Sequence, residues 1–295
     1  MKLSIITINY NNAEGLRKTM ESVLAQTYTE IEYIIVDGAS TDGSVDVIRE
    51  LATRPTIKWV SEKDTGIYNA MNKGIRMATG EYIEILNSGD ILAADDVTER
   101  MMAALKTHQC KVYGVMCKGT EDSNAENPAS SPIENCPAIF YGNMIKVNAA
   151  GKVVGTSGYT EYSLRQFYSS TLNHDCAYIR RDLFEEYGLY DEQLKIVSDW
   201  KWYLQAIGLG KVKPEYVDID VTIFDDGGIS ETNLTLRNAE RRKVLEEVLP
   251  PAVLWDYDTH AFEMEQMKRL RRWHLYGIVY FMERVLFKLE KWFKI

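Results

Sequence analysis

Apolar residues in the first 105 positions follow two spacings. Short apolar runs such as Leu3–Ile8 and Ile31–Val36 indicate buried strands. Between them, apolar residues recur every three or four positions, as Leu16, Met20 and Val23 do, which indicates amphipathic helices. The same patterns predict further strands at 57–60 and 81–86, and helices at 12–26, 44–51, 67–78 and 95–105. This alternation predicts an α/β fold with a doubly wound, mostly parallel sheet.

The loops that follow the predicted strands carry the candidate ligand-binding groups. In an open α/β sheet, ligands bind at the carboxyl ends of the strands. Asp37, Asp64 and Asp90 each follow a different predicted strand, so we expect their carboxylates to converge. Asp37 can accept a hydrogen bond from a ribose hydroxyl or a base N–H, and Asn9 and Thr7 offer short polar groups beside it. The sequence therefore predicts a nucleotide cleft at this edge.

The segment Ala78–Asp90 predicts a helix end, a buried strand and a short loop that carries Asn87 and Asp90. A loop with a carboxylate and no Lys or Arg suits a hard divalent cation shared with a substrate diphosphate. The same residue types also form tight turns, which leaves a plain turn as the alternative. The chain has neither a GxGxxG motif after the first strand nor a P-loop. A cation at Asp90 would therefore have to neutralise the negative charge of the phosphates.

Four segments together resemble the family 2 glycosyltransferases of bacterial polysaccharide, O-antigen and capsule assembly. They are Ser4–Asn11, Val36–Gly43, Ser61–Gly74 and Ala78–Glu81, and the resemblance covers about the first 230 residues. It implies the GT-A fold and inverting transfer from a nucleotide-diphosphate sugar, most often a UDP-sugar, with Mg²⁺ or Mn²⁺.

The resemblance also implies roles for individual residues. The nucleotide site would comprise Thr7, Asn9, Tyr10, Asp37, Asp64, Asn72 and Lys73. Asn87 and Asp90 would form the metal loop. Because Asn87 and Gly89 stand where the family commonly has Asp, Asp90 would be the only protein carboxylate on the ion.

A second polar cluster lies between His174 and Trp200. By the resemblance, Asp199 is the catalytic base, which deprotonates the acceptor hydroxyl as the anomeric carbon is attacked. The alternative is that Ser198 or Asp199 caps the helix that follows. His174 either reaches the diphosphate or metal or is structural. Trp200 is a candidate for stacking on the acceptor sugar.

The amino-acid composition of the chain limits the kinds of partner that it is expected to bind. The 295 residues are 45% hydrophobic, which allows a sizeable core, and carry a formal net charge of −9, which argues against nucleic acid. The four cysteines show no CxxC or CxxH spacing, which is typical of reduced cytosolic thiols. Since no signal peptide or membrane span is evident, we expect a cytoplasmic protein.

The C-terminal region has a different character. Residues 266–295 carry eight Lys or Arg against two Asp or Glu, interleaved with Trp, Phe and Leu. We expect a helix at 233–248 and a long helical stretch at 259–293 that binds the inner face of the cell membrane. The alternative is docking on the domain or on a second subunit in a homodimer. The predicted domains are 1–230, divided at 105/106 into nucleotide-sugar and acceptor halves, and a helical extension at 231–295.

We therefore predict a metal-dependent inverting glycosyltransferase that moves a sugar, a hexose or an N-acetylhexosamine, to a hydroxyl of a growing, lipid-linked or oligosaccharide surface glycan. The alternative is a non-catalytic protein of the same fold that binds nucleotide sugars or serves as a scaffold. A glycine-containing segment at 224–230 is either a flap over the bound nucleotide or a plain loop.

Overall fold

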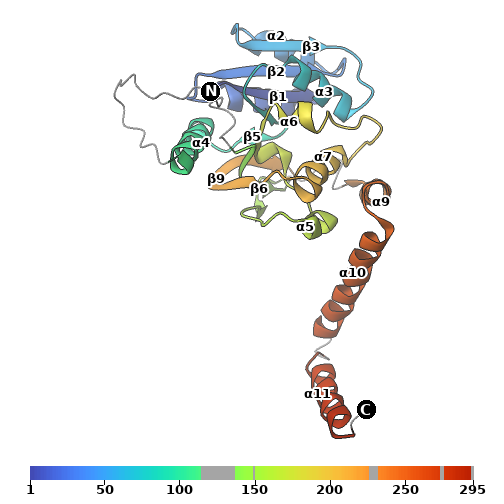
Figure 1. The fold of residues 1–295 in the computed structure, drawn as a ribbon. Helices are drawn as coiled ribbons and strands as arrows, with labels where there is room; N and C mark the ends of the chain where they lie inside the picture. The colour runs from blue at the N-terminus through green and yellow to red at the C-terminus, as the bar shows by residue number, and fades with distance from the viewer. Residues whose placement is uncertain (114–136, 149, 226–231, 273–275, 294–295) are drawn as a thin grey trace. The chain divides into compact units, whose positions relative to one another are not determined.

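The computed structural model describes residues 1–113, 137–148, 150–225, 232–272 and 276–293 (Figure 1). The chain divides into two compact units, Met1–Arg241 and Arg242–Ile295. Most of the polar segment at 110–138 lies outside the described residues, as does most of the glycine-containing segment 224–230, from residue 226 onward.

The nucleotide half of the first unit has the predicted alternation of strands and helices. Its parallel strands lie in the order β3-β2-β1-β4. Their bounds are β1 Leu3–Asn9, β2 Ile31–Asp37, β3 Ile57–Ser61 and β4 Tyr82–Ile85, and the connecting helices are α1 Ala13–Leu24, α2 Ser44–Leu51 and α3 Ile67–Met77. The register pairs Asn9 with Asp37 and Asp37 with Ser61. The polar ends of three strands therefore lie at one edge.

The sheet continues into the acceptor half through strands that the sequence patterns did not indicate. Beyond β4 the order is β8-β6-β9-β5, and β7 pairs with β6. These strands are β5 Ile91–Leu92, β6 Ile139–Val147, β7 Val153–Thr156, β8 Ala177–Arg180 and β9 Pro214–Asp225. The helices are α4 Val97–Tyr113, α5 Leu164–Ser169, a short 3₁₀ turn at His174–Cys176, α6 Leu183–Glu186 and α7 Ser198–Tyr203, which runs on as a π-helix at Leu204–Leu209. The strands of the acceptor half run in mixed directions. They join the parallel half where β8 pairs with β4 in antiparallel orientation.

Two sets of contacts hold the nucleotide half together. The core includes Leu3, Ile5, Leu16 and Ile35, all without exposed surface. At the amino ends of the strands, the buried Glu32 carboxylate accepts hydrogen bonds from four residues. One precedes β1, one lies in β1, one in β3 and one in the segment between α3 and β4. The donors are Lys2, Ser4, Lys58 and Thr79. This network fixes the edge opposite to the candidate site.

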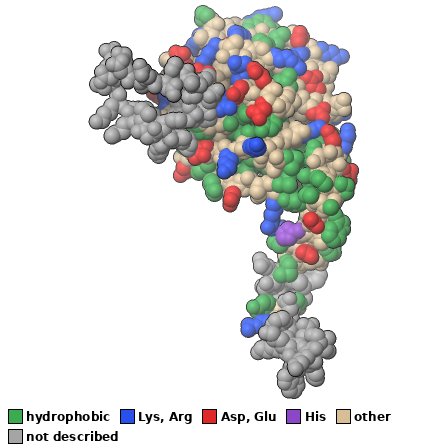
Figure 2. Space-filling view, in the orientation of Figure 1, with side chains coloured by type: hydrophobic (Ala, Val, Ile, Leu, Met, Phe, Trp, Pro, Cys, Tyr) green, Lys and Arg blue, Asp and Glu red, His purple; other side chains and the backbone are tan. Residues whose placement is uncertain are grey.

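The C-terminal helices are α9 Leu234–Val248, α10 Pro251–Arg272 and α11 Tyr276–Phe293. The stretch predicted as one helix from 259 is thus two described helices, and α10 begins earlier, at Pro251, because proline suits the first turn of a helix. Among the residues described, no helix is long and apolar enough to cross a membrane. On the visible face of the first unit, basic and acidic side chains are interspersed (Figure 2).

Candidate functional site

Asp37, at the carboxyl end of β2, is fully buried and held by four donors. Its oxygens accept from Asn9 Nδ2 at 2.8 Å, the Ser40 amide at 3.0 Å, Ser40 Oγ at 2.6 Å and Ser61 Oγ at 2.7 Å. Burial alone would raise the pKa of Asp37, but these hydrogen bonds lower it below its usual value. Asp37 is therefore an ionised centre that organises the loops after β1, β2 and β3. Sequence reasoning found Asn9 but missed Ser40 and Ser61.

Tyr10, Asp64 and Lys73 come together beside Gly38. A Cβ on Gly38 would lie 3.1 Å from Tyr10 Cδ2 and 3.2 Å from Asp64 Oδ2, so a larger residue would require these side chains to shift by a few tenths of an ångström. Lys73 Nζ pairs with Asp64 at 2.5 Å and with Glu62 at 2.8 Å. The Tyr10 side chain is 70% exposed, which leaves its ring accessible to a ligand.

Two other residues of the predicted nucleotide site point into the interior. Thr7 is fully buried, and its hydroxyl accepts from Tyr33 at 3.0 Å. Asn72 is 1% exposed; its amide bonds both backbone groups of Tyr190 and also reaches Glu192. In this structure these side chains hold the walls of the cleft together and present no surface to a nucleotide.

Asp199, in the first turn of α7, meets side chains from two distant segments. Tyr68 of α3 donates its hydroxyl to Asp199 Oδ1 at 2.7 Å, and His174 Nδ1 lies 3.4 Å from Oδ2. Burial would raise the pKa of Asp199, but His174 and Tyr68 together lower it, so the carboxylate is ionised at neutral pH. Sequence reasoning missed Tyr68, although it lies within the recognised segment 61–74.

The cap alternative for Asp199 is excluded by the geometry of α7. The cap position is Val197, and no side-chain hydrogen bond caps the helix. Ser198 Oγ is buried without a hydrogen-bond partner in the described part of the chain. The Asp199 side chain therefore contacts His174 and Tyr68 and does not cap the helix.

His174 links Asp199 to the loop after β4. Its Nε2 lies 3.1 Å from Asn87 Nδ2. Burial lowers the pKa of His174, but the hydrogen bond and the charges of Asp199, Asp175 and Asp90 raise it to about 9. A protonated ring donates from both nitrogens, so Asn87 would then turn its amide oxygen toward Nε2. His174 is therefore a cation between the predicted base and the predicted metal loop.

The loop Asn87–Asp90 carries the two predicted metal ligands. The Asp90 side chain is nearly buried, and Asn87 Oδ1 is buried without a hydrogen-bond partner among the described residues. These two oxygens are ligands of the kind that Mg²⁺ and Mn²⁺ take. In the described ranges, however, no group of three His, Cys, Asp or Glu side chains is placed to hold a metal. The residues fit a cation only if a substrate diphosphate completes its coordination.

The burial of Trp200 contradicts the prediction that its ring stacks on the acceptor sugar. Its ring is 1% exposed, its Nε1 donates to the Phe167 carbonyl at 2.8 Å, and the Arg241 guanidinium lies 5.0 Å from its centroid. Trp202 is also buried, and its Nε1 donates to the Gly188 carbonyl. The faces of α7 that carry these two rings are enclosed, so both rings belong to the core.

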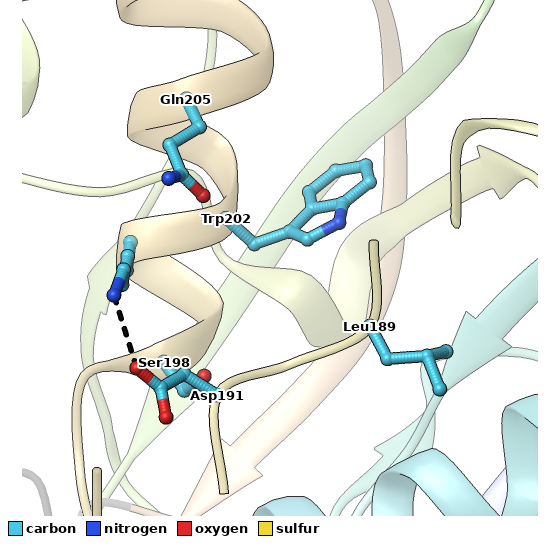
Figure 3. A pocket seen from close by; sticks show the side chains of 6 residues that line it. Leu189, Asp191, Ser198, Trp202 and Gln205 are labelled. Carbon is cyan, nitrogen blue, oxygen red and sulfur yellow. Dashed lines mark hydrogen bonds and ion pairs between the residues drawn. The ribbon is translucent and has the colours of Figure 1, made fainter. Parts of the chain in front are cut away.

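A cavity of about 210 Å³ lies beside α7 (Figure 3). An ion pair of 3.0 Å between Lys201 and Asp191 crosses one of its walls. The lining residues are Leu189, Asp191, Ser198, Lys201, Trp202 and Gln205. The cavity is thus adjacent to the candidate base but contains none of the predicted ligand-binding side chains.

The chain and its fold have counterparts among known proteins. The model for glycosyl transferase family 2 matches residues 4–188. This chain belongs to that family. A glycosyltransferase of PGL/p-HBAD biosynthesis from Mycobacterium bovis is 25% identical over 232 residues, which are 78% of this chain and 79% of that protein. An uncharacterized glycosyltransferase of Mycobacterium tuberculosis is 30% identical over 209 residues, 69% of this chain and 68% of the relative.

Solved structures agree on the fold. S. aureus TarS in complex with UDP-GlcNAc superposes with a TM-score of 0.56 at 18% identity over 76% of this family 2 chain. The matched part is 58% of the TarS chain. The mannosyltransferase PcManGT from Pyrobaculum calidifontis, in complex with GDP-Man and Mn²⁺, gives a TM-score of 0.55 at 18% identity over 85% of this chain and 66% of its own. The predicted GT-A fold and glycosyltransferase class are confirmed.

Proposed function

We propose that this family 2 glycosyltransferase transfers a sugar, with inversion, from a nucleotide-diphosphate sugar to an acceptor hydroxyl, and that Asp199 is the base. One observation carries the proposal: Asp199 contacts Tyr68 of the nucleotide half and His174, which in turn contacts Asn87. The candidate base and the candidate diphosphate loop are therefore joined through a single side chain. The UDP-GlcNAc and GDP-Man complexes of the structural neighbours support a nucleotide-sugar donor.

The reaction follows from these positions. The acceptor oxygen gives its proton to Asp199 as it bonds to the anomeric carbon, and the bond from that carbon to the diphosphate oxygen breaks. His174 and Tyr68 hold the carboxylate in its ionised, acceptor form. The His174 cation, which contacts Asn87 of the candidate metal loop, would stabilise the negative charge that develops on a leaving diphosphate bound there.

We propose that Mg²⁺ or Mn²⁺ binds at Asp90 and Asn87 together with the donor diphosphate. A bound cation would neutralise charge on the leaving group. The nearly buried Asp90 carboxylate supports this assignment, and Asn87 lies three residues before it in the same loop. With one carboxylate among the ligands, affinity for the cation alone should be low, and the nucleotide should raise it.

We propose a lipid-linked surface glycan as the acceptor and a cytoplasmic enzyme that associates with the inner face of the cell membrane through α10 and α11. In α11, Ile278, Tyr280, Phe281 and Met282 are each at least half exposed, and Arg284 lies beside Tyr280. Apolar and basic groups of this kind bind anionic bilayer surfaces. Association of two copies through the same helices is the competing arrangement.

Donor turnover tests the proposed function. Purified protein with Mn²⁺ is supplied with a panel of UDP-, GDP- and dTDP-sugars, and release of the nucleoside diphosphate is measured with and without glycan acceptors. We expect one donor class to be turned over, and the same class to raise the thermal unfolding temperature. Binding without turnover of any donor, even with acceptors, would support a non-catalytic nucleotide-sugar-binding protein instead.

A further inference from the structure

The guanidinium of Arg241 lies over Trp200, the residue after the candidate base. Its Cζ is 5.0 Å from the ring centroid, and its Nε is buried without a hydrogen-bond partner in the described chain. Among the residues that the structure describes, no carboxylate forms an ion pair with it. A half-buried cation without a counter-anion is costly, so it calls for an explanation.

The position of Arg241 is fixed by its neighbour Glu240. The Glu240 carboxylate accepts from the backbone amides of Lys195 at 2.8 Å and Ile196 at 2.9 Å, just before α7 begins. Both Glu240 oxygens are therefore occupied by the backbone. The contact fastens the first half of α9 to the segment that leads into α7, and it holds Arg241 against Trp200 before any ligand arrives.

A second cation accompanies Arg241. Arg237 lies one helical turn earlier, on the same face of α9. Burial and the charge of Arg237 lower the pKa of Arg241, whereas the charge of Asp199 raises it, so both the second cation and the base lie within electrostatic range. Arginine stays protonated at physiological pH and presents a planar fork to oxyanions. The pair thus forms a positive region next to the base.

We propose that Arg241, flanked by Arg237, binds an oxyanion carried by the acceptor substrate, either a phosphate or a sugar carboxylate. This inference rests on the proposed function, in which Asp199 faces the acceptor hydroxyl. The donor loops belong to β1–β4, whereas Arg241 belongs to α9 and lies over Trp200 of α7. An anionic group on the acceptor would neutralise the guanidinium and align the hydroxyl with Asp199.

Calorimetric titration of the full chain tests the proposal with two probes, inorganic phosphate and glucuronate, in the presence of saturating UDP. UDP fills the donor region, so that a probe reports on a different site. We expect at least one probe to bind, and R241Q to weaken it by about tenfold or more. Binding of phosphate alone identifies a phosphoryl group on the acceptor, and binding of glucuronate alone identifies a carboxylate. The matched control K243Q removes the same charge from an exposed position two residues away and should change the affinity by less than about twofold.

Three results would overturn the inference. Neither probe binds the wild-type protein; R241Q and K243Q behave alike; or R241Q weakens UDP as strongly as the probe, which would assign Arg241 to the donor. If R241Q does not fold, R241K carries the test, because it keeps the charge but loses the planar fork, and should weaken the probe about threefold or more. Wild-type protein that binds UDP but neither probe refutes this inference alone, whereas failure to bind or turn over any donor refutes the proposed function.

Discussion

Two carboxylates of the site are held in opposite ways. Asp37 accepts four hydrogen bonds from the ends of the parallel strands and from its own loop, all within the nucleotide half. Asp199 has two side-chain partners, Tyr68 and His174, which come from segments far away in the sequence. Asp37 therefore has several partners, all from one half of the unit, whereas the contacts of Asp199 form only when both halves are assembled. Loss of one contact should therefore matter far more at Asp199.

Replacing Asp199, the proposed base, should have the largest effect. Asp199→Asn keeps the shape of the side chain but removes the proton acceptor, so we expect kcat for transfer to fall by about 10²–10⁴. Donor affinity, measured by titration with UDP, should stay within about twofold. Asp182→Asn, which changes an exposed carboxylate, is the control. Near-normal transfer by Asp199→Asn would move the base elsewhere.

The metal loop should give the next largest effect. Asp90→Ala removes the only carboxylate assigned to the cation, so the affinity for Mn²⁺ in the presence of UDP should fall by about 10–100-fold. Titration of Mn²⁺ against the UDP-saturated protein measures this change, with Asp96→Ala on the surface as the control. Unchanged affinity would place the cation at another site.

Tyr68 tests the long-range support of the base directly. Tyr68→Phe removes the hydroxyl that stabilises the ionised carboxylate, so kcat should fall by about tenfold. The pKa of Asp199 should rise, and the acidic limb of the kcat profile should move to higher pH. Tyr28→Phe loses a hydrogen bond to the Met1 carbonyl at the amino end of β1 and should leave the profile unchanged. A loss of activity without a shift of the profile would indicate a purely structural role.

The smallest effect on activity is expected at Glu32, at the opposite edge of the sheet. Burial would raise the pKa of Glu32, but Lys58, Ser4 and Thr79 hold it well below the usual value. The carboxylate therefore stabilises the fold above pH 4.5, and this contribution disappears as the pH falls. Glu32→Gln should lower the free energy of unfolding by about 2 kcal/mol at pH 7 and by less at pH 3.

Denaturant unfolding at the two pH values measures this difference. Glu50→Gln, which breaks an exposed pair with Arg17, should cost less than about 1 kcal/mol at either pH. An equal cost for both variants would show that burial adds nothing at Glu32.

The sequence predicted the regions where local pattern dominates. The strands from Leu3 to Ile85 and their helices follow from apolar periodicity, because every strand there is joined to the next by a helix. Strands β6 and β8 lack that signal, since they pair with each other and with β4 and β9 across long stretches of sequence and in mixed directions. Asn9, Asp37 and Asp90 could be predicted as site residues because they lie at the ends of strands that the apolar pattern identifies.

Contacts between distant segments were harder to predict. Tyr68 lies in a recognised segment, but its partner Asp199 is 131 positions away, and spacing alone does not reveal such a pair. Trp200 was expected at the acceptor because exposed aromatic rings bind sugars, yet Phe167 and Arg241 enclose it. Burial of this kind depends on tertiary packing and therefore becomes visible only in the folded chain.

A double-mutant cycle between Tyr68→Phe and Asp199→Asn tests most directly whether α3 and α7 meet at one functional carboxylate. If Tyr68 acts through Asp199, the double variant should have the kcat of Asp199→Asn alone, because the hydroxyl no longer has an ionised partner to support. If the losses in log kcat add independently, the two side chains serve different sites, and the account of a single cleft is contradicted.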